Sequence, residues 1–300
     1  MNTPAKNEKS SIPELVFRPE YEVSDIEQAQ TGDVARKLST AERIWNIDGV
    51  RKFVILLSLV VAWQVYTVGL DVEPLMLPSF WISFSTLIRD LFQSDLIFKV
   101  WFSIKVLIIG YSAGLFLAAV LILWATVSRF GSDFISMATA MFNPLPAIAL
   151  LPLAMLWFGL GTASLVFVLI HSVLWAVALS THSGFEGVSQ TLRMIGRNYG
   201  LHGIGYVIKI LVPAALPSIL AGMKIGWAFA WRTLIGAELV FGASSGSGGL
   251  GWYIFESSQN IDTDGVFAGL FMVILIGFFV ENVVFKNIER RTVNRWGMQR

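Results

Sequence analysis

A series of long apolar runs restricts the fold of this chain more than any other feature, because each run is about as long as a helix that crosses a bilayer. In that solvent a spanning segment must satisfy its own backbone hydrogen bonds, which favours helices. The runs predict spans at about residues 53–70, 104–127, 134–158, 163–180, 214–241 and 266–285. Only 14% of the residues are charged, against about a quarter in soluble domains. The chain is therefore predicted to be an all-α integral membrane protein with six transmembrane helices.

The chain is predicted to divide into a membrane domain, residues 51–290, and two polar ends. Residues 1–50 bury little, and we interpret them as a mobile, solvated tail, with a regulatory or docking role as the alternative. A short helix is expected near Thr40–Ile47, capped by Ser39 or Thr40. Residues 291–300 form a second, basic tail.

The distribution of Lys and Arg predicts the orientation in the membrane. On the opposite side from the amino terminus, the short loops hold Arg89 and Lys99. The flanks and loops on the amino-terminal side hold Arg36, Lys37, Arg43, Arg51, Lys52, Arg129, Arg193, Arg197, Lys209, Lys286, Arg290, Arg291, Arg295 and Arg300. Both termini and the loop 187–213 are therefore predicted to be cytoplasmic, and the loop 242–264 to be external.

Prolines interrupt the third predicted span at Asn143-Pro144-Leu145-Pro146 and again at Pro152. Unpaired backbone inside a membrane is tolerated only where it is buried in protein or lines a cavity. Asn143, Pro144 and Pro146 are therefore candidates for a substrate pathway. In the second span, Gly110 and Gly114 form a small-residue face that favours close helix packing.

Charged and polar side chains inside the predicted spans need a partner or water, since a charge at mid-bilayer costs about 2.5–3.5 kcal/mol on insertion scales. Lys224 and Arg232 lie eight residues apart in the fifth span. For Arg232 a pathway role and an internal ion pair remain alternatives. His171 is interpreted as a buried histidine whose hydrogen bonds are satisfied. Three charged residues near span ends are expected to snorkel or to be solvated, namely Lys105, Glu238 and Glu281.

The segment Gly187–Pro217 has the pattern of an amphipathic helix, a glycine break and a proline stop. Its apolar face carries Val188, Leu192, Ile195 and Tyr199, and the break falls at Gly200. A helix tied at both ends to membrane spans cannot shift without moving them, so the segment is a candidate lever. A helix lying passively in the membrane interface is the alternative.

Patterns typical of catalysis, metal binding or nucleic-acid binding do not occur in the sequence, and there are no cysteines. The glycines of residues 246–251 match G-x-G-x-x-G, but they follow a membrane span rather than a strand, so a dinucleotide site is discarded. We predict no metal and no cofactor on this chain and no nucleic-acid partner. Uphill transport would draw its energy from outside the chain.

The spacing of Gly200, Ile210, Val212 and Pro213 resembles the cytoplasmic loop E-A-A-x3-G-x9-I-x-L-P of ABC-importer permeases, with Val in place of Leu. Met194, Ile195 and Gly196 stand where that loop has E-A-A. The runs 149–159 and 231–238 and the repeated proline of Pro213-Ala-Ala-Leu-Pro217 resemble the nitrate, sulfonate and taurine branch of that family. The resemblance covers about residues 53–290.

This resemblance implies a type I ABC-importer permease fold with a cytoplasmic coupling helix, in a bacterial inner membrane. It implies a non-enzymatic permease subunit for a small, anionic solute such as nitrate, a sulfonate, taurine or a related organic acid. The implied partners are a second copy of the chain, two cytoplasmic ATPases that hold ATP and Mg²⁺, and an external substrate-binding protein. A secondary carrier driven by an ion gradient is the alternative, although the inverted repeats typical of such carriers are not evident.

The resemblance and the residue patterns together give three sets of candidate site residues. The ATPase-coupling set is Arg193, Met194, Gly196, Arg197, Asn198, Tyr199, Gly200, Leu201, His202 and Pro213. The substrate-pathway set is Asn143, Pro144, Pro146, His171, Trp231, Arg232 and Glu238. The external-loop set, which by resemblance shapes the mouth of the pathway, is Gly248, Gly249 and Gly251.

Overall fold

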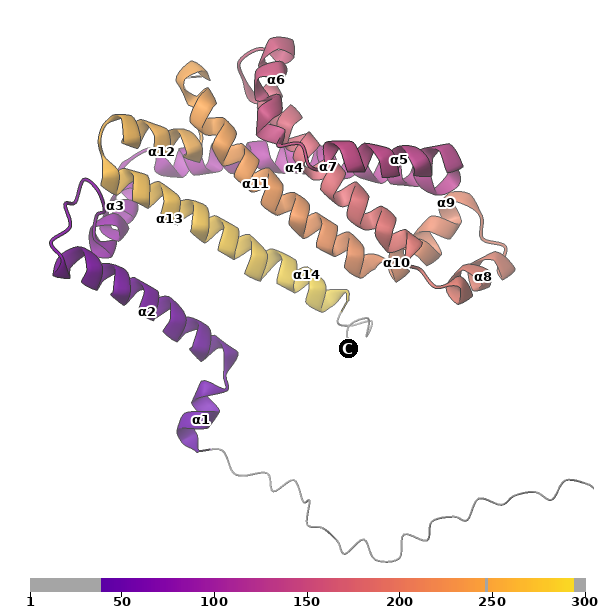
Figure 1. The fold of residues 1–300 in the computed structure, drawn as a ribbon, viewed down its shortest axis with the longest axis horizontal. Coiled ribbons are helices and arrows are strands. Elements are labelled where there is room, and N and C mark those ends of the chain that lie inside the picture. The colour runs from indigo at the N-terminus through magenta and orange to yellow at the C-terminus, as the bar shows by residue number, and fades with distance from the viewer. Residues whose placement is uncertain (1–38, 246–247, 294–300) are drawn as a thin grey trace, which may run out of the picture. The chain divides into compact units, whose positions relative to one another are not determined.

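The computed structural model describes residues 39–245 and 248–293, and the regular structure of this part is helical throughout (Figure 1). The predicted tails at residues 1–38 and 294–300 lie outside it. The α-helices are α1 Thr40–Trp45, α2 Asp48–Gly69, α3 Phe80–Gln93, α4 Leu96–Val127, α5 Arg129–Phe142, α6 Leu151–Phe158, α7 Thr162–Glu186, α8 Gln190–Asn198, α9 Gly203–Tyr206, α10 Val212–Ala214, α11 Leu216–Ser245, α12 Leu250–Gln259, α13 Thr263–Phe279 and α14 Lys286–Arg291. A 3₁₀ turn spans Ala147–Leu150, and π-helical turns span Val207–Leu211 and Val280–Phe285.

The chain forms two compact units, one ending at Leu57 and the other beginning at Ser58. In the first unit, the short helix expected near Thr40 is α1. The Ser39 hydroxyl accepts from the Glu42 backbone N–H, and the Glu42 carboxylate accepts from the Ser39 N–H. This reciprocal pair is a capping box, so Ser39 rather than Thr40 caps the helix.

Four stretches of the described chain are long and apolar enough to cross a membrane by themselves, and two bent helix pairs raise the number to six if each pair is one span. The four are α2, α4, α7 and the continuous stretch Thr263–Arg291. The predicted number of six is therefore reached only when both bent pairs count. The helices also begin earlier than the apolar runs, since α4 starts at Leu96 rather than near residue 104.

One bend occurs where proline was expected to interrupt the third span, and the other where a proline stop was expected before the fifth span. Between α5 and α6 the chain turns by 90° through Asn143–Pro146, and between α10 and α11 it turns by 79°. Proline removes a helical hydrogen bond and disfavours the helical conformation of the residue before it. The predicted span 134–158 is thus an angled pair rather than one continuous helix, whereas the predicted span 214–241 lies almost wholly within the continuous helix α11.

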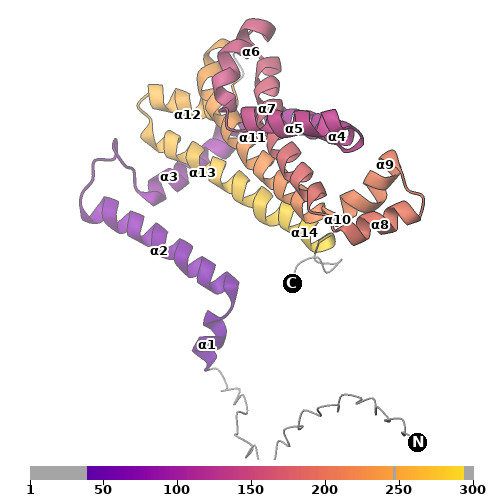
Figure 2. The ribbon, with the colours of Figure 1, turned by 45° about the vertical axis from the view of Figure 1, so that its right-hand side comes forward.

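In the second unit, α4, α7 and α11 pack against one another around the larger core cluster (Figures 1 and 2). Leu107, Leu169, Val173 and Leu234 are among its fully buried side chains. In both views α12 lies near one end of α11 and α8 beyond the other. This arrangement separates the glycine-rich loop from the candidate coupling segment by the length of a long helix.

Gly110 brings α4 and α7 into close contact, as its spacing with Gly114 predicted. A Cβ atom at Gly110 would lie 2.6 Å from the Cβ of Leu169. We expect Gly110→Ala to force the two helices apart and to cost about 1–3 kcal/mol of stability through overpacking. Thermal unfolding of the purified protein in detergent would show a lower Tm.

Gly69→Ala is the matched control, because the nearest side-chain atom to a Cβ there is 3.9 Å away. Alanine has a higher helix propensity than glycine, so Gly69→Ala should keep or slightly raise the Tm. Equal Tm values for the two variants would contradict the close packing of α4 on α7.

Candidate functional site

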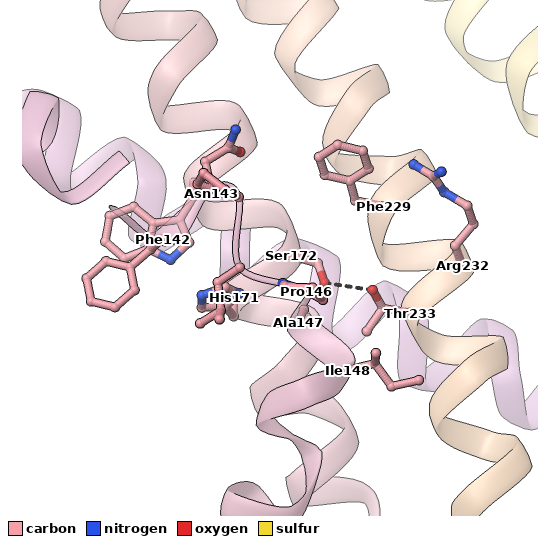
Figure 3. A pocket seen from close by; sticks show the side chains of 13 residues that line it. Phe142, Asn143, Pro146, Ala147, Ile148, His171, Ser172, Phe229, Arg232 and Thr233 are labelled. Carbon is pink, nitrogen blue, oxygen red and sulfur yellow. Dashed lines mark hydrogen bonds between the residues drawn. The ribbon is translucent and has the colours of Figure 1, made fainter. Parts of the chain in front are cut away.

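A cavity of about 360 Å³ opens beside the turn that joins α5 to α6 (Figure 3). The turn forms one wall, and side chains of α7 and α11 form the others. Its lining residues are Phe142, Asn143, Pro144, Leu145, Pro146, Ala147, Ile148, His171, Ser172, Trp175, Phe229, Arg232 and Thr233. Five of the seven pathway candidates therefore meet here, since Asn143, Pro144, Pro146, His171 and Arg232 are brought together from three separate stretches.

His171 does not have the satisfied hydrogen bonds that we expected. Within the described residues neither of its ring nitrogens has a partner, and the same holds for the indole nitrogen of Trp175. Phe142 stacks on Trp175 with ring centroids 5.0 Å apart, and both rings meet the imidazole edge-on. Aromatic neighbours hold these polar atoms in place but offer no hydrogen bond. A buried unpaired donor or acceptor costs about 1–3 kcal/mol, so the cavity favours a water or ligand atom at these groups.

Arg232 has no carboxylate within ion-pair distance among the described residues, so the internal ion pair considered for it is absent there. Its Nε donates to the Ala228 carbonyl at 3.1 Å, and its guanidinium carbon lies 5.1 Å from the centre of the Phe229 ring. Figure 3 shows the side chain folded along α11 at the rim of the cavity. The guanidinium thus keeps hydrogen-bond donors available for an anion.

Lys224, on the same helix as Arg232, does have carboxylate partners. Its Nζ lies 3.1 Å from Glu281, in the π-helical turn before α14, and 2.9 Å from Glu289, in α14 itself. Both carboxylates come from distant parts of the sequence, and Glu281 was expected to be solvated. Lys224 is therefore part of an ion-pair cluster between helices and leaves no charge for a ligand.

Trp231 does not line the cavity, although it was placed in the pathway set. Its side chain is buried, its Nε1 donates to the Val273 carbonyl at 3.3 Å, and its ring stacks on Trp227. The neighbouring position in a helix points about 100° away, so Trp231 packs toward α13 while Arg232 reaches the cavity.

Glu238 is 2% exposed, which contradicts the expectation of a solvated residue near a span end. The Ser103 hydroxyl oxygen lies 2.7 and 2.8 Å from the two carboxylate oxygens, and the Gly251 backbone N–H donates to the carboxylate at 2.8 Å. Ser103 in turn accepts from the Leu250 N–H at 2.8 Å. The carboxylate is satisfied by donors at the first turn of α12, where the helix dipole also favours negative charge.

The external-loop glycines explain this burial. A Cβ at Gly249 would lie 2.1 Å from a Glu238 carboxylate oxygen and 2.3 Å from the Ser103 hydroxyl oxygen. A Cβ at Gly251 would lie 2.4 Å from the Ile235 carbonyl oxygen, and one at Gly248 would overlap the Trp252 ring. The glycine-rich loop can cover the Glu238 carboxylate only because the glycines at the contact have no side chains. Gly246, part of the same motif, lies outside the described residues.

The candidate coupling helix α8 begins at Ser189, whose hydroxyl accepts from the Leu192 N–H. Leu192, Ile195 and Tyr199 of its predicted apolar face are exposed, Tyr199 by 82%, whereas Val188 is buried. Gly200 follows the helix with φ +71°, a left-handed conformation that glycine adopts at little cost. An exposed apolar helix face outside the spans is typical of a surface that another protein covers.

The remaining coupling candidates divide into exposed and structural residues. Met194, Arg197, Asn198 and His202 are exposed, and Leu201 is half-buried. The Arg193 guanidinium donates to the carbonyls of Phe185 and Val188 at the end of α7, so it is occupied within this chain. Gly196 is buried against Tyr206 and Ile210, and Pro213 lies inside α10.

Several residues of the site were not found by sequence reasoning. Ser103 lies 135 residues from Glu238, and no spacing rule links them. Phe142, Trp175 and Phe229 are aromatic residues in apolar runs, where most such residues only fill a core. Ser172 contacts Thr233 across two helices at 3.0 Å, and a Ser in a span was the weak signal available for it.

Angled helices around a cavity that carries a few polar side chains, with an exposed helical segment between two apolar stretches, are the features of a multi-span membrane protein of the transport type. Residues 110–294 match the family described as binding-protein-dependent transport system inner membrane component. This match covers more than half of the chain, and the chain belongs to that family.

Curated relatives extend the comparison. The chain is 29% identical to the permease SsuC of Escherichia coli, named for aliphatic sulfonate transport, over 57% of this chain and 63% of SsuC. It is 31% identical to the taurine transport system permease TauC of Escherichia coli over 47% of this chain and 50% of TauC. It is 24% identical to the nitrate import permease NrtB of Synechocystis over 83% of this chain and 91% of NrtB. The matched part thus spans less than two thirds of the length of SsuC and half of the length of TauC.

The contributions of the Ser103 and Glu238 side chains to stability should be energetically coupled. Ser103→Ala and Glu238→Gln each remove part of one buried network, and each loss is expected to cost about 1–3 kcal/mol. The double variant should lose less than the sum of the two, by about 0.5–3 kcal/mol. The Tm values of the four proteins measure this difference. Ser112→Ala, an exposed serine on the same helix, should leave the Tm unchanged, and strict additivity would contradict the network.

Proposed function

We propose that this chain is the membrane permease subunit of an ATP-driven importer for a small oxyanion. The observation that carries the proposal is Arg232, which has no carboxylate partner among the described residues and lies at the rim of a cavity in a chain of the binding-protein-dependent transport family. The relatives named for sulfonate, taurine and nitrate transport support an anion, because each of those solutes presents oxygen atoms with negative charge. A bidentate guanidinium suits such a group.

In this proposal the chain works as a homodimer with two cytoplasmic ATPases and an external substrate-binding protein, and both of its termini face the cytoplasm. ATP and Mg²⁺ are held by the ATPases, so the chain itself carries no catalytic group. The exposed face of α8 supports ATPase docking, and the Arg193 contacts to the end of α7 support a rigid connection from α8 to the spans. Closure of the ATPases would then move α7 and change access to the cavity.

The alternative, a secondary carrier driven by an ion gradient, would need acidic groups in the pathway to bind the coupling ion. No Asp or Glu is among the described residues that line the Arg232 cavity. Glu238 is engaged with Ser103 and the start of α12 instead. These features of the Arg232 cavity favour the ATP-driven importer, and Glu186, which lines the neighbouring cavities, is largely exposed to water rather than enclosed as an ion-binding group would be.

The docking surface on α8 can be tested with exposed side chains. Tyr199→Ala removes a large apolar contact, and Gly200→Val strains a left-handed position. Both should lower co-purification of the ATPase and substrate-stimulated ATP hydrolysis by about tenfold, the loss expected for an interface anchor. Tyr66→Ala, an exposed tyrosine of α2, is the matched control and should behave as the parent. Normal ATPase assembly in Tyr199→Ala and Gly200→Val would contradict the docking role.

Variants of Arg232 test whether the transported substrate is an anion that this side chain binds. Arg232→Ala should reduce uptake of the transported anion about tenfold or more, since a charge-assisted contact is worth about 1.5–3 kcal/mol. Arg232→Lys should restore uptake only in part because the paired geometry is lost. Uptake into proteoliposomes with the ATPase and binding protein is the measurement, and Lys105→Ala, an exposed charge on α4, is the control. Parental uptake by both Arg232 variants would show that the charge is not used by the substrate.

A further inference from the structure

Two more cavities continue from the one beside Arg232. The second, about 360 Å³, shares Asn143 and Pro144 with the first. The third, about 300 Å³, shares His182 and Glu186 with the second and reaches Arg193 next to α8. We call this series the α5–α7 groove. It leads from the turn between α5 and α6 to the carbonyl end of α7.

The two faces of α5 differ in chemistry. Ser132, Ser136, Thr139 and Asn143 fall within about 60° of one another around the helix and line the groove. The opposite face carries large exposed apolar side chains, Phe130, Phe134, Met137 and Met141. This is the pattern of a membrane helix with one face toward lipid or protein and the other toward water.

The facing side of α7 is polar as well. Ser183, His182 and Glu186 line the second cavity, and His182 Nε2 lies 3.2 Å from the Ser132 hydroxyl oxygen across the groove. A different cavity of similar size is lined by residues of α4, α7, α11 and the π-helical turn Val207–Leu211. Thr181 is the one polar residue among its described lining. The α5–α7 groove thus differs in its polar lining from this apolar cavity.

We propose that the α5–α7 groove is the cytoplasmic half of the oxyanion pathway, and that Ser136, Ser183 and His182 contact the transported anion between Arg232 and the cytoplasm. This inference rests on the proposed function and adds the route and its residues. Hydroxyl and imidazole groups donate hydrogen bonds that replace water around an anion without holding it as firmly as a fixed ion pair.

The charged side chains along the groove suit the passage of an anion. Arg232 lies at one end and Arg129 at the other, where it lines the third cavity. One carboxylate intervenes, Glu186, whose oxygen lies 3.9 Å from His182 Nδ1. Its side chain is largely exposed, so water screens its repulsion of a passing anion.

The absence of native cysteine in the sequence allows a direct test with single-cysteine variants. Ser136→Cys and Ser183→Cys are made in the full chain and assembled with its ATPase and binding protein in proteoliposomes. Each is treated with the anionic reagent 2-sulfonatoethyl methanethiosulfonate, and ATP-dependent import is compared before and after labelling of the same variant. We expect labelling to lower import about fivefold or more, because a fixed sulfonate repels the substrate and fills the route. Saturating substrate should slow the labelling.

Met137→Cys on the opposite face of α5 and the cysteine-free parent are the controls, and their import should change by less than about twofold. Three results would each overturn the proposed route. The first is complete labelling at positions 136 and 183 without loss of import, and the second is no labelling at either position. The third is an equal loss of import in Met137→Cys. If the cysteine-free parent shows no ATP-dependent import of any oxyanion, the proposed function fails instead, so the two failures are distinguishable.

Discussion

The structure depends on the requirement that backbone polar groups inside a membrane find partners. Continuous helices meet it for α4 and α7, which pack closely on each other through Gly110 and Leu169. The regular helix is interrupted at Asn143–Pro146, where α5 turns by 90° into α6 and the Asn143 and Leu145 N–H groups still find backbone partners. This interruption lies beside a cavity that carries polar side chains. The unusual backbone and the candidate substrate site are therefore one feature, and the proline pair creates both.

Polar side chains of the membrane domain fall into two groups by whether their hydrogen bonds are satisfied inside the chain. Glu238 and Lys224 have partners from distant segments, and each joins one helix to another. His171 and Arg232 have no side-chain partner among the described residues, and both line the same cavity. Satisfied groups fix helix positions, whereas unsatisfied groups are available to a ligand. This distinction separates polar residues that join helices from the candidate substrate-pathway residues better than burial does.

The sequence was sufficient for the helical class, the proline-bent third span and the helix break at Gly200. Each of these is set by residues within a few positions of one another. The partners of Glu238 and Lys224 and the open hydrogen bonds of His171 were not predictable, because they depend on which distant helices meet. Sequence position near a span end suggested solvent for Glu238, but a glycine at 249 lets the loop cover it. Local patterns determine elements, and contacts between elements determine sites.

α7 is the element through which the coupling segment and the cavity communicate in the proposed importer. Its carbonyl end is bound by Arg193, its middle carries His171 and Ser172, and it lies between α4 and α11 in the core. A helix is stiff along its axis, so a displacement imposed at α8 reaches the cavity without an intervening flexible loop. Lys224 joins α11 to α14 and to the π-helical turn before it, so α7 would move against a neighbour whose position is fixed. Access to the cavity would then change because α7 slides or tilts relative to α11.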